Sequence, residues 1–292
     1  MNKIALVIPY FISNGQSFPN YFNFWLESAK NNSDFCDFII FTNNHKKYDY
    51  PKNVKVFYME FEQFKDIVQK NFDFKITLDS PYKLCDYKVT YGEVLHNYLN
   101  DYEFWGYCDI DLIFGDISKF ITEELLSKYD KIFQRGHFTL YRNSSEINCL
   151  YRTDMGGEPY YKTVFTSPKS FAFDEYPGIA KIYRFLDIPV YEQMPFVDVW
   201  VNQKCFARTT NKIEKLVFVY DHGKLFSVSK KSKIEIMYVH LQKRTMKVET
   251  SNFKCFKIQP EEFVDIDVNT KYSIRIPSKW YINHVIEKLF KH

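Results

Sequence analysis

Two aspartates, Asp109 and Asp111, are separated by one residue and follow directly on the apolar run FWGYC. A carboxylate is costly to keep ionised in an apolar interior, because the charge loses its hydration. At the carboxyl end of a strand in an open α/β sheet, however, side chains face the crevice where ligands bind. Residues i and i+2 of an extended strand point to the same side. The pair can therefore share one Mg²⁺ or Mn²⁺ ion, whose other positions go to water and substrate phosphates.

The D-x-D pattern is short, and two other kinds of protein are compatible with it. In phosphatases of the haloacid-dehalogenase type, a D-x-D also follows a buried strand, and its first aspartate, here Asp109, is the nucleophile. Those enzymes usually carry Thr or Val where this chain has Ile113, and their motif lies nearer the start of the fold. A non-catalytic carbohydrate-binding protein is the other alternative, because aromatic residues make up 19% of the chain and can stack on sugars.

The elements before the aspartates alternate between strands and helices. Apolar runs predict strands at 3–11, 37–44, 53–60 and 103–109. Helical spacing of apolar residues predicts helices at 18–32, at 61–72 and from about Asp86 to Leu99. This alternation implies an α/β fold with a mostly parallel, Rossmann-like sheet flanked by helices.

The pattern after the aspartates is looser, and the predicted strands become short. A helix is expected at 118–130 with Ser118 as its N-cap, and residues 153–178 are expected to be irregular. Strands are predicted at 131–134, 137–143, 215–229 (a hairpin turning at Asp-His-Gly) and 233–241. An amphipathic helix at 278–290 ends the chain. We expect one domain over 1–292, with a C-terminal β extension and this terminal helix.

Bulk properties exclude several classes of protein. A net charge of +3 gives no basis for nucleic-acid binding. No apolar run approaches the ~20 residues of a membrane span, and the first residues lack the cleavage site of a signal peptide. The six cysteines form no C-x-x-C pair, so buried free thiols are expected. These features favour a cytoplasmic protein.

The chain resembles bacterial glycosyltransferases of the GT-A fold, of the type encoded with capsule and lipopolysaccharide biosynthesis. The resemblance lies in IALVIPYF, FIIFTNN, PYKLCDYKVTYGEVL, FWGYCDIDLIFGDI, GHFTLYRN, FAFDEYPGI and YVHLQKR, which span about residues 3–244. It implies a nucleotide-binding half over 1–117, which ends in the D-x-D, and an acceptor half over 118–292.

The resemblance assigns donor-binding roles to particular residues. Asp109 and Asp111 would hold Mn²⁺ or Mg²⁺ against the diphosphate of a nucleotide-sugar, by analogy a UDP-sugar. The residues expected to bind the donor nucleotide are Ile8, Pro9, Tyr10, Thr42, Asn43, Asp86, Lys88, Asp109, Lys243 and Arg244. For Lys88, a solvated helix face is the alternative, and lysine lacks the bidentate fork of the arginine common in related enzymes.

His240 is the expected third metal ligand, because several GT-A families carry a histidine on a late strand at this point. The basic pair Lys243 and Arg244 follows it and would neutralise the departing diphosphate. Imidazole is a suitable ligand for Mn²⁺. A hydrogen-bonded structural histidine is the alternative.

The catalytic base and the acceptor contacts are less defined. Asp174 and Glu175 are the candidate bases of an inverting enzyme, with Asp198 and Glu158 in reserve. For Asp174 and Glu175, the alternative is that one of them caps the following helix or binds hydroxyls of the donor sugar. A retaining enzyme needs no such base.

Candidates on the acceptor side are His137 and Tyr141, for which plain strand core is the alternative. The acceptor is expected to be a glycan or a lipid-linked glycan. The basic terminal helix, with Trp280, Tyr281 and Phe290, would then contact the membrane surface peripherally. A sugar nucleotidyltransferase is discounted, because the loop after the first strand has one glycine and no basic residue.

Overall fold

The computed structural model describes residues 3–13, 16–157, 159–200, 206, 208 and 215–266. Contacts between Cα atoms divide the chain into two compact units. The first unit comprises Met1–Phe18, Ala29–Ile110 and Ile117–Met194. The second unit comprises Pro19–Ser28, Asp111–Asp116 and Pro195–His292. The single domain predicted for residues 1–292 stays a prediction.

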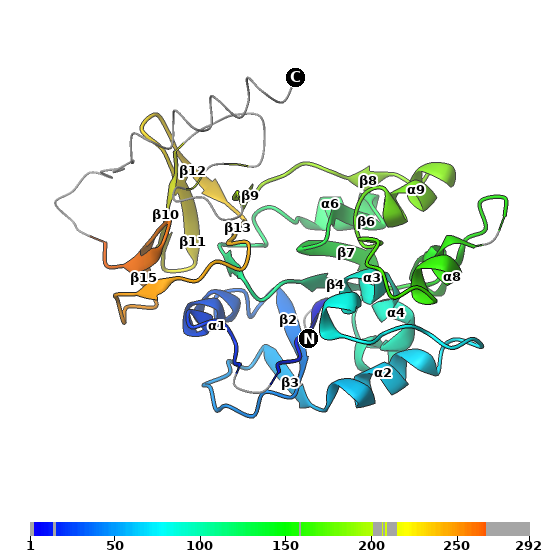
Figure 1. The fold of residues 1–292 in the computed structure, drawn as a ribbon. Helices are drawn as coiled ribbons and strands as arrows, with labels where there is room; N and C mark the ends of the chain where they lie inside the picture. The colour runs from blue at the N-terminus through cyan, green and yellow to red at the C-terminus, as the bar shows by residue number, and fades with distance from the viewer. Residues whose placement is uncertain are drawn as a thin grey trace, which may run out of the picture. The chain divides into compact units, whose positions relative to one another are not determined.

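The first unit is built on a seven-stranded sheet with the strand order β3-β2-β1-β4-β7-β6-β8 (Figure 1). Its strands are β1 (Ile4–Pro9), β2 (Cys36–Thr42), β3 (Val54–Tyr58), β4 (Phe104–Cys108), β6 (Lys131–Arg135), β7 (Phe138–Arg142) and β8 (Val190–Tyr191). The strands from β3 to β4 are parallel, whereas β7 is antiparallel to both β4 and β6. The prediction of an α/β fold with a sheet rich in parallel strands is therefore confirmed.

The central strands of this sheet are apolar because both of their faces are covered. All seven residues of β2 and all five of β4 are buried, as expected for strands inside a parallel sheet. Helices of the first unit include α2 (Phe61–Gln69), α6 (Glu123–Lys128), α8 (Tyr160–Phe165) and α9 (Gly178–Phe185). Thus α8 corrects the expectation that 153–178 is irregular throughout.

The continuous helix predicted from Asp86 to Leu99 is wrong. The chain there forms four short segments: α3 (Leu84–Tyr87), η2 (Lys88–Thr90), α4 (Tyr91–Val94) and α5 (His96–Leu99). The Thr90 hydroxyl donates to the carbonyl of Tyr87 at 2.8 Å, a local bond of the kind that competes with a regular helix. Leu95 separates α4 from α5 with a non-helical ψ of 20°. Local bonding has overridden the apolar periodicity.

The N-cap predicted at Ser118 is also wrong. The helix α6 begins at Glu123, and the side chain of Thr122 accepts from the backbone N–H of Leu125 at 3.4 Å. Thr122 is therefore the N-cap residue of α6, a position where threonine is a preferred residue.

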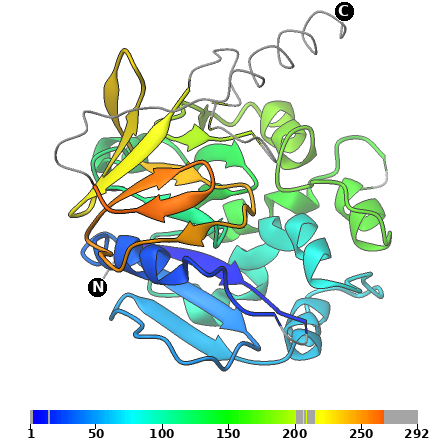
Figure 2. The same ribbon diagram turned by 60° about the vertical axis from the view of Figure 1, so that its left-hand side comes forward.

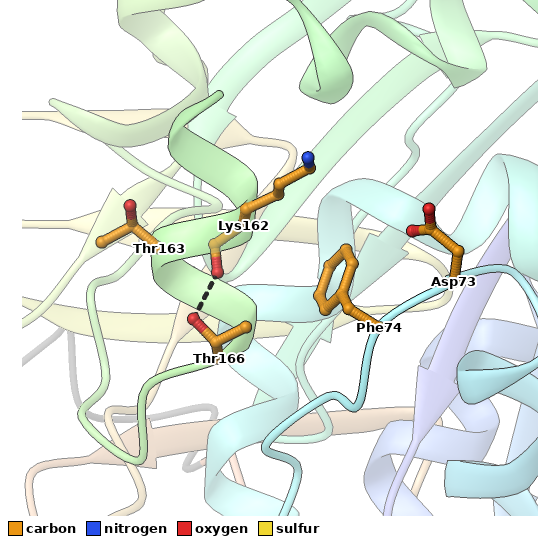
Figure 3. A pocket seen from close by; sticks show the side chains of 5 residues that line it. All are labelled: Asp73, Phe74, Lys162, Thr163 and Thr166. Atoms are coloured by element: carbon orange, nitrogen blue, oxygen red, sulfur yellow. Dashed lines mark hydrogen bonds between the residues drawn. The ribbon is translucent and has the colours of Figure 1, made fainter. Parts of the chain in front are cut away.

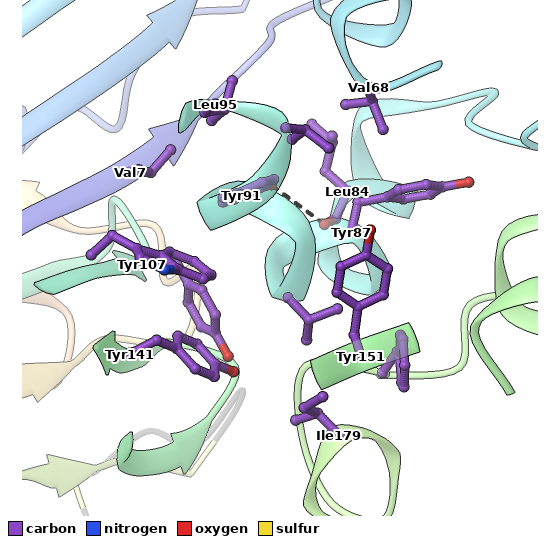
Figure 4. Close-up of a cluster of buried hydrophobic side chains, with 14 of the residues drawn as sticks. Val7, Val68, Leu84, Tyr87, Tyr91, Leu95, Tyr107, Tyr141, Tyr151 and Ile179 are labelled. Atoms are coloured by element: carbon purple, nitrogen blue, oxygen red, sulfur yellow. Dashed lines mark hydrogen bonds between the residues drawn. The ribbon is translucent and has the colours of Figure 1, made fainter. Parts of the chain in front are cut away.

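Aromatic side chains fill the interior of the first unit. Figure 4 shows Tyr87, Tyr91, Tyr107 and Tyr141 among Leu and Val side chains of the same buried cluster. Tyr87 stacks on Phe165 with ring centroids 4.3 Å apart. Most of the aromatic content of this unit is thus accounted for by core packing.

The second unit contains two sheets and most of helix α1 (Phe22–Lys30). One sheet has six strands in the order β12-β11-β10-β15-β16-β14, and the other has three in the order β5-β13-β9. Figure 2 shows the six-stranded sheet in yellow to orange. Its strands are β10 (Val217–Asp221), β11 (Lys224–Val228), β12 (Lys233–Ile236), β14 (Lys247–Val248), β15 (Cys255–Gln259) and β16 (Glu262–Val264). The three-stranded sheet consists of β5 (Leu112–Phe114), β9 (Val197–Asp198) and β13 (Tyr238–His240).

The single strand predicted at 233–241 is divided between these two sheets. β12 pairs with β11, whereas β13 pairs with β5 and β9. Between them, Met237 donates its N–H to Pro195 at 2.7 Å and accepts from Gly115 at 2.7 Å. The chain changes partners at Met237, so one apolar run supplies two strands.

Two further expectations concern cysteines and membranes. Cys36 and Cys108 are buried free thiols, as expected, but Cys85, Cys149 and Cys255 are only partly buried, and Cys205 lies outside the described residues.

None of the helices in the described part of the chain has the length and apolar character needed to cross a membrane. The predicted helix at 278–290 lies outside the described residues.

Candidate functional site

In the first unit, Lys88 joins two of the predicted carboxylates. Its Nζ donates to Asp109 Oδ1 at 2.7 Å and to the carbonyl of Gly136 at 2.5 Å, and lies 3.6 Å from Asp174 Oδ2. Asp109 follows β4 directly, and its N–H donates to the carbonyl of His137 at 3.0 Å. The solvated helix face considered for Lys88 is therefore wrong, because the ammonium is held against Asp109 by a short ion pair.

Asp174 is buried beside this lysine, with 3% of its surface exposed. Burial raises the pKa of the Asp174 carboxyl to about 7, and the positive charge of Lys88 opposes that rise. The neighbouring Glu175 accepts from the backbone N–H of Gly136 at 2.9 Å. Neither carboxylate caps α9, whose N-cap residue is Pro177. A carboxyl group with a pKa near 7 suits proton transfer at neutral pH.

The residues predicted to flank a nucleobase lie at the carboxyl ends of β1 and β2. Ile8 and Pro9 pair with Ile40 and Phe41 of β2, and β1 also runs parallel to β4. These residues therefore lie at the same end of the sheet as Asp109.

The side chains at the carboxyl ends of β1 and β2 contact other groups of the protein. The Asn43 carboxamide exchanges two hydrogen bonds with the backbone of Ile12, at 2.8 and 3.0 Å. The Thr42 hydroxyl accepts from the N–H of Asn44 at 3.1 Å, and the ring of Tyr10 lies 5.2 Å from that of Phe18. These contacts fix the two loops at this end of the sheet.

Asp86 is completely buried and is held by groups of the protein. Its carboxylate accepts from the N–H groups of Phe171 and Phe173 at 2.9 to 3.1 Å and forms an ion pair of 2.7 Å with Lys83. Lys83 also donates to the carbonyls of Val164 and Lys169. This network ties the segment before Asp174 to α3, so the contacts of Asp86 position the site.

In the second unit, His240 lies between two carboxylates. Its Nε2 is 3.4 Å from Asp111 Oδ1, and its Nδ1 is 3.0 Å from Asp198 Oδ1. The pairing of β13 with β5 and β9 fixes this arrangement, because His240 is in register with Leu112 on one side and Asp198 on the other. The second oxygen of Asp111 accepts from the N–H of Lys243 at 2.6 Å.

This arrangement has the chemistry of a metal site. Two ligand atoms bonded to one ion at about 2.1 Å lie about 3.0 to 3.4 Å apart, depending on the coordination geometry. The separation of His240 Nε2 and Asp111 Oδ1 falls within that range. A carboxylate that accepts from the other ring nitrogen, as Asp198 can, is the usual partner of a metal-bound histidine. The carboxylate oxygens suit Mn²⁺ or Mg²⁺, whereas the imidazole nitrogen suits Mn²⁺ better than Mg²⁺.

Residues 6–267 of the chain match the model of DUF6625, a family of unknown function. The chain belongs to this family. No curated protein matches the sequence significantly.

Among solved structures, similarity is found to the galactosyltransferase LgtC in complex with donor and acceptor sugar analogs, at 12% identity and a TM-score of 0.37. An active-site mutant of LgtC is similar at 12% identity and a TM-score of 0.36. Both comparisons cover 66% of the DUF6625 chain and 75% of the LgtC chain.

The two basic residues after His240 differ in their surroundings in this DUF6625 chain. Lys243 is exposed. The guanidinium of Arg244 donates to the carbonyls of Trp200 and Pro260 and lies 5.1 Å from the ring centroid of Phe206. Lys243 is thus the more accessible of the pair to an anionic ligand.

Of the acceptor candidates, Tyr141 belongs to the core of the first unit. Only 2% of its surface is exposed, and its ring stacks on Trp105 at a centroid distance of 4.7 Å. His137 is also buried, at the turn between β6 and β7. The strand-core alternative therefore describes Tyr141 in this DUF6625 chain. Glu158, a reserve base, lies outside the described residues.

Sequence reasoning missed Lys131, at the start of β6. It is fully buried, its Nζ has no hydrogen-bond partner within the described residues, and the ring of Tyr183 lies 4.5 Å away. Burial lowers the pKa of this lysine to about 7, although Asp174 and Glu192 oppose the change. A lysine at the first residue of a strand usually extends to water, so no signal in the sequence indicates this burial.

A separate pocket of about 320 Å³ lies on the first unit (Figure 3). It is lined by Asp73 and Phe74, which follow α2, and by Lys162, Thr163 and Thr166 around α8. The Thr166 hydroxyl donates to the carbonyl of Lys162 at 2.7 Å. None of these residues was predicted to take part in chemistry, so the pocket adds nothing to the candidate site.

Proposed function

We propose that this protein is a metal-dependent glycosyltransferase with a GT-A-like fold and a D-x-D motif. It would transfer a sugar from a nucleotide-diphospho-sugar, in the first instance a UDP-sugar, to a glycan or lipid-linked glycan of a capsule or lipopolysaccharide. The observation that carries the proposal is the alignment of Asp111, His240 and Asp198 in the second unit.

The metal ligands in this proposal are Asp109, Asp111 and His240. Asp109 and Asp111 are separated in the chain only by Ile110, and Asp111 and His240 have the spacing of two ligands of one ion. Asp198 would hold the His240 ring with Nε2 directed toward the ion. Bound Mn²⁺ or Mg²⁺ would neutralise charge on the diphosphate of the donor.

The chain's own groups have separate roles. Lys88 orients Asp109 and offsets the charge of both Asp109 and Asp174. Lys243 would attract the diphosphate, because the residue is exposed and its backbone N–H donates to Asp111 in the second unit. The loops after β1 and β2 would bind the nucleobase at the sheet end that carries Asp109.

Asp174 is the preferred base if the reaction inverts the sugar. Its raised pKa allows it to accept a proton near neutral pH, whereas Glu175 is engaged with the backbone of Gly136. We further propose a cytoplasmic location, with peripheral membrane contact through the helix predicted at 278–290.

The test is thermal unfolding with nucleoside diphosphates, each with and without Mn²⁺. A ligand at about 100 times its Kd stabilises the folded state by about 2.7 kcal/mol. We expect UDP to raise the melting temperature only when Mn²⁺ is present, and Asp111→Asn to abolish the shift. Asp101→Asn, at an exposed carboxylate before β4, is the matched control and should keep it.

Two outcomes would overturn the proposal. If no nucleoside diphosphate shifts the transition with Mn²⁺ or Mg²⁺, no donor site of this kind is present. If the protein instead releases phosphate from small phosphoesters, and Asp109→Asn abolishes this release while Asp111→Asn retains part of it, the phosphatase alternative is correct. Metal-independent binding of glycans alone would favour a carbohydrate-binding protein.

A further inference from the structure

A second set of metal-binding side chains lies on the six-stranded sheet of the second unit, at the turn between β10 and β11. Asp221 and Lys224 close this hairpin, and the two residues between them, His222 and Gly223, have φ values of +45° and +88°. Positive φ at both central positions is the signature of a tight two-residue hairpin turn. The turn therefore holds the side chains of Asp221 and His222 at a fixed end of the sheet.

The start of β15 lies against the same turn. Cys255 is in register with Asp221, and the N–H of His222 donates to the carbonyl of Lys254 at 2.8 Å. The Asn252 side chain accepts from the N–H groups of Lys254 and Cys255 at 3.2 and 3.1 Å. Backbone bonds thus attach the turn to β15 on one side, and the Asn252 carboxamide fixes the loop before β15.

Three potential ligand atoms converge there. His222 Nδ1 and Asp221 Oδ1 are 2.7 Å apart, and one ligand atom from each of Asp221, His222 and Cys255 lies within 4.8 Å of the others. Asp221 and His222 are exposed, and Cys255 is partly exposed. Partial burial, and to a smaller extent the carboxylate of Asp221, raise the pKa of the Cys255 thiol. A cation would reverse that effect, because metal ligation requires the thiolate.

We propose that Asp221, His222 and Cys255 form a binding site for a divalent transition-metal ion of the Zn²⁺ class. Thiolate sulfur and imidazole nitrogen favour Zn²⁺ or Co²⁺ over Mg²⁺, Ca²⁺ or Mn²⁺. In a tetrahedral site with bonds of about 2.0 to 2.3 Å, ligand atoms lie about 3.3 to 3.8 Å apart. Side-chain rotation on this exposed turn is enough to reach that spacing.

The site has three protein ligands and leaves the fourth tetrahedral position for water or another ligand. On binding, the Cys255 thiol gives its proton to solvent, and the sulfur bonds to the ion as thiolate. The bound ion would link the β10–β11 turn to the start of β15. This site uses none of the residues of the proposed transferase and does not depend on that function.

The first test is titration of the full-length, reduced protein with Co²⁺. Binding at this site gives a sulfur-to-cobalt charge-transfer absorption, which the oxygen and nitrogen ligands proposed for the D-x-D site cannot give. We expect one equivalent of Co²⁺ to produce the band, Zn²⁺ to displace it, and Cys255→Ser to abolish it. Asp111→Asn should leave it unchanged.

Two matched variants sharpen the result. His222→Asn keeps the turn, because asparagine tolerates positive φ, and we expect it to weaken Co²⁺ binding at least tenfold. Cys85→Ser removes another partly buried thiol and should have no effect. A band that survives Cys255→Ser, or that is lost in Cys85→Ser, would overturn the proposal.

A measurement on the unmodified chain covers the case in which Cys255→Ser does not fold. Zn²⁺ should slow alkylation of Cys255 by iodoacetamide at least tenfold, as followed by peptide mass spectrometry, while Cys85 and Cys149 are alkylated at unchanged rates. Equal rates at Cys255 with and without Zn²⁺ would refute the site.

Discussion

Lys131 is a buried cation whose removal should stabilise the protein. Its ammonium has no hydrogen-bond partner within the described residues, and it contacts the ring faces of Tyr183 and Tyr141 at 4.5 and 5.3 Å. Lys131→Met retains the length and flexibility of the side chain but removes the charge. We therefore expect Lys131→Met to be more stable than the unmodified protein at neutral pH.

The size of the effect follows from the pKa of Lys131, which burial lowers from 10.5 to about 7. At about 1.4 kcal/mol per pKa unit, this difference corresponds to a cost of about 5 kcal/mol at most. Between pH 7 and 10.5 the unfolded chain binds the proton and the folded chain does not, so stability rises with pH. The cost is therefore complete below about pH 7 and disappears as the pH approaches 10.5.

The measurement is urea-induced unfolding at pH 6.5, 8 and 9.5. Lys131→Met should gain at least about 1 kcal/mol at pH 6.5, since mutational gains are commonly smaller than the electrostatic limit, and the gain should shrink toward zero at pH 9.5. Lys47→Met, at an exposed lysine, is the control and should change stability by less than about 0.5 kcal/mol. A gain that is absent at every pH, or that does not vary with pH, would refute the reasoning.

Two further predictions concern the groups that support the site. Asp86→Asn should destabilise the protein by about 3 to 5 kcal/mol in urea unfolding, because it leaves the buried Lys83 without a counter-charge; an effect below about 1 kcal/mol would show that the pair is dispensable. Asp198→Asn should weaken Mn²⁺ binding about 10- to 100-fold, as measured by calorimetry. The melting temperature of the metal-free protein should change little. An unchanged affinity for Mn²⁺ would mean that Asp198 does not orient His240.

The central strands of the first unit could be predicted from sequence because burial on both faces leaves a continuous apolar signal. The strands predicted at 3–11 and 103–109 contain β1 and β4, and the strand predicted at 37–44 covers all of β2 except Cys36. The turn at His222 and Gly223 was equally visible, since few sequences other than Asn-, Asp- or Gly-containing pairs adopt its backbone.

Elements that depend on distant partners could not be predicted. The run 233–241 is uniformly strand-like, and only the bonds of Met237 to Pro195 and Gly115 reveal the change of sheet. The segments between Asp86 and Leu99 have the apolar spacing of one helix, but local hydrogen bonds interrupt it.

The candidate site shows the same limit. Asp109, Asp111 and His240 were identified by residue type and order, whereas the pairing of His240 with Asp198 depends on strand register. The ion pair of Lys88 with Asp109 and the burial of Lys131 likewise depend on packing across the first unit. Sequence therefore indicates the residues proposed as ligands, and tertiary structure shows the groups that contact them.

The hydrogen bonds that Phe171 and Phe173 donate to Asp86 have a consequence for synthesis on the ribosome. These partners lie 85 and 87 residues after Asp86 in the chain. The carbonyls of Val164 and Lys169 lie 81 and 86 residues after Lys83. In a nascent chain that ends before residue 173, the ion pair of Lys83 and Asp86 therefore lacks part of the hydrogen bonds that it has in the folded protein. The first unit should thus complete its folding late in translation, and a fragment ending near residue 150 should remain prone to aggregation.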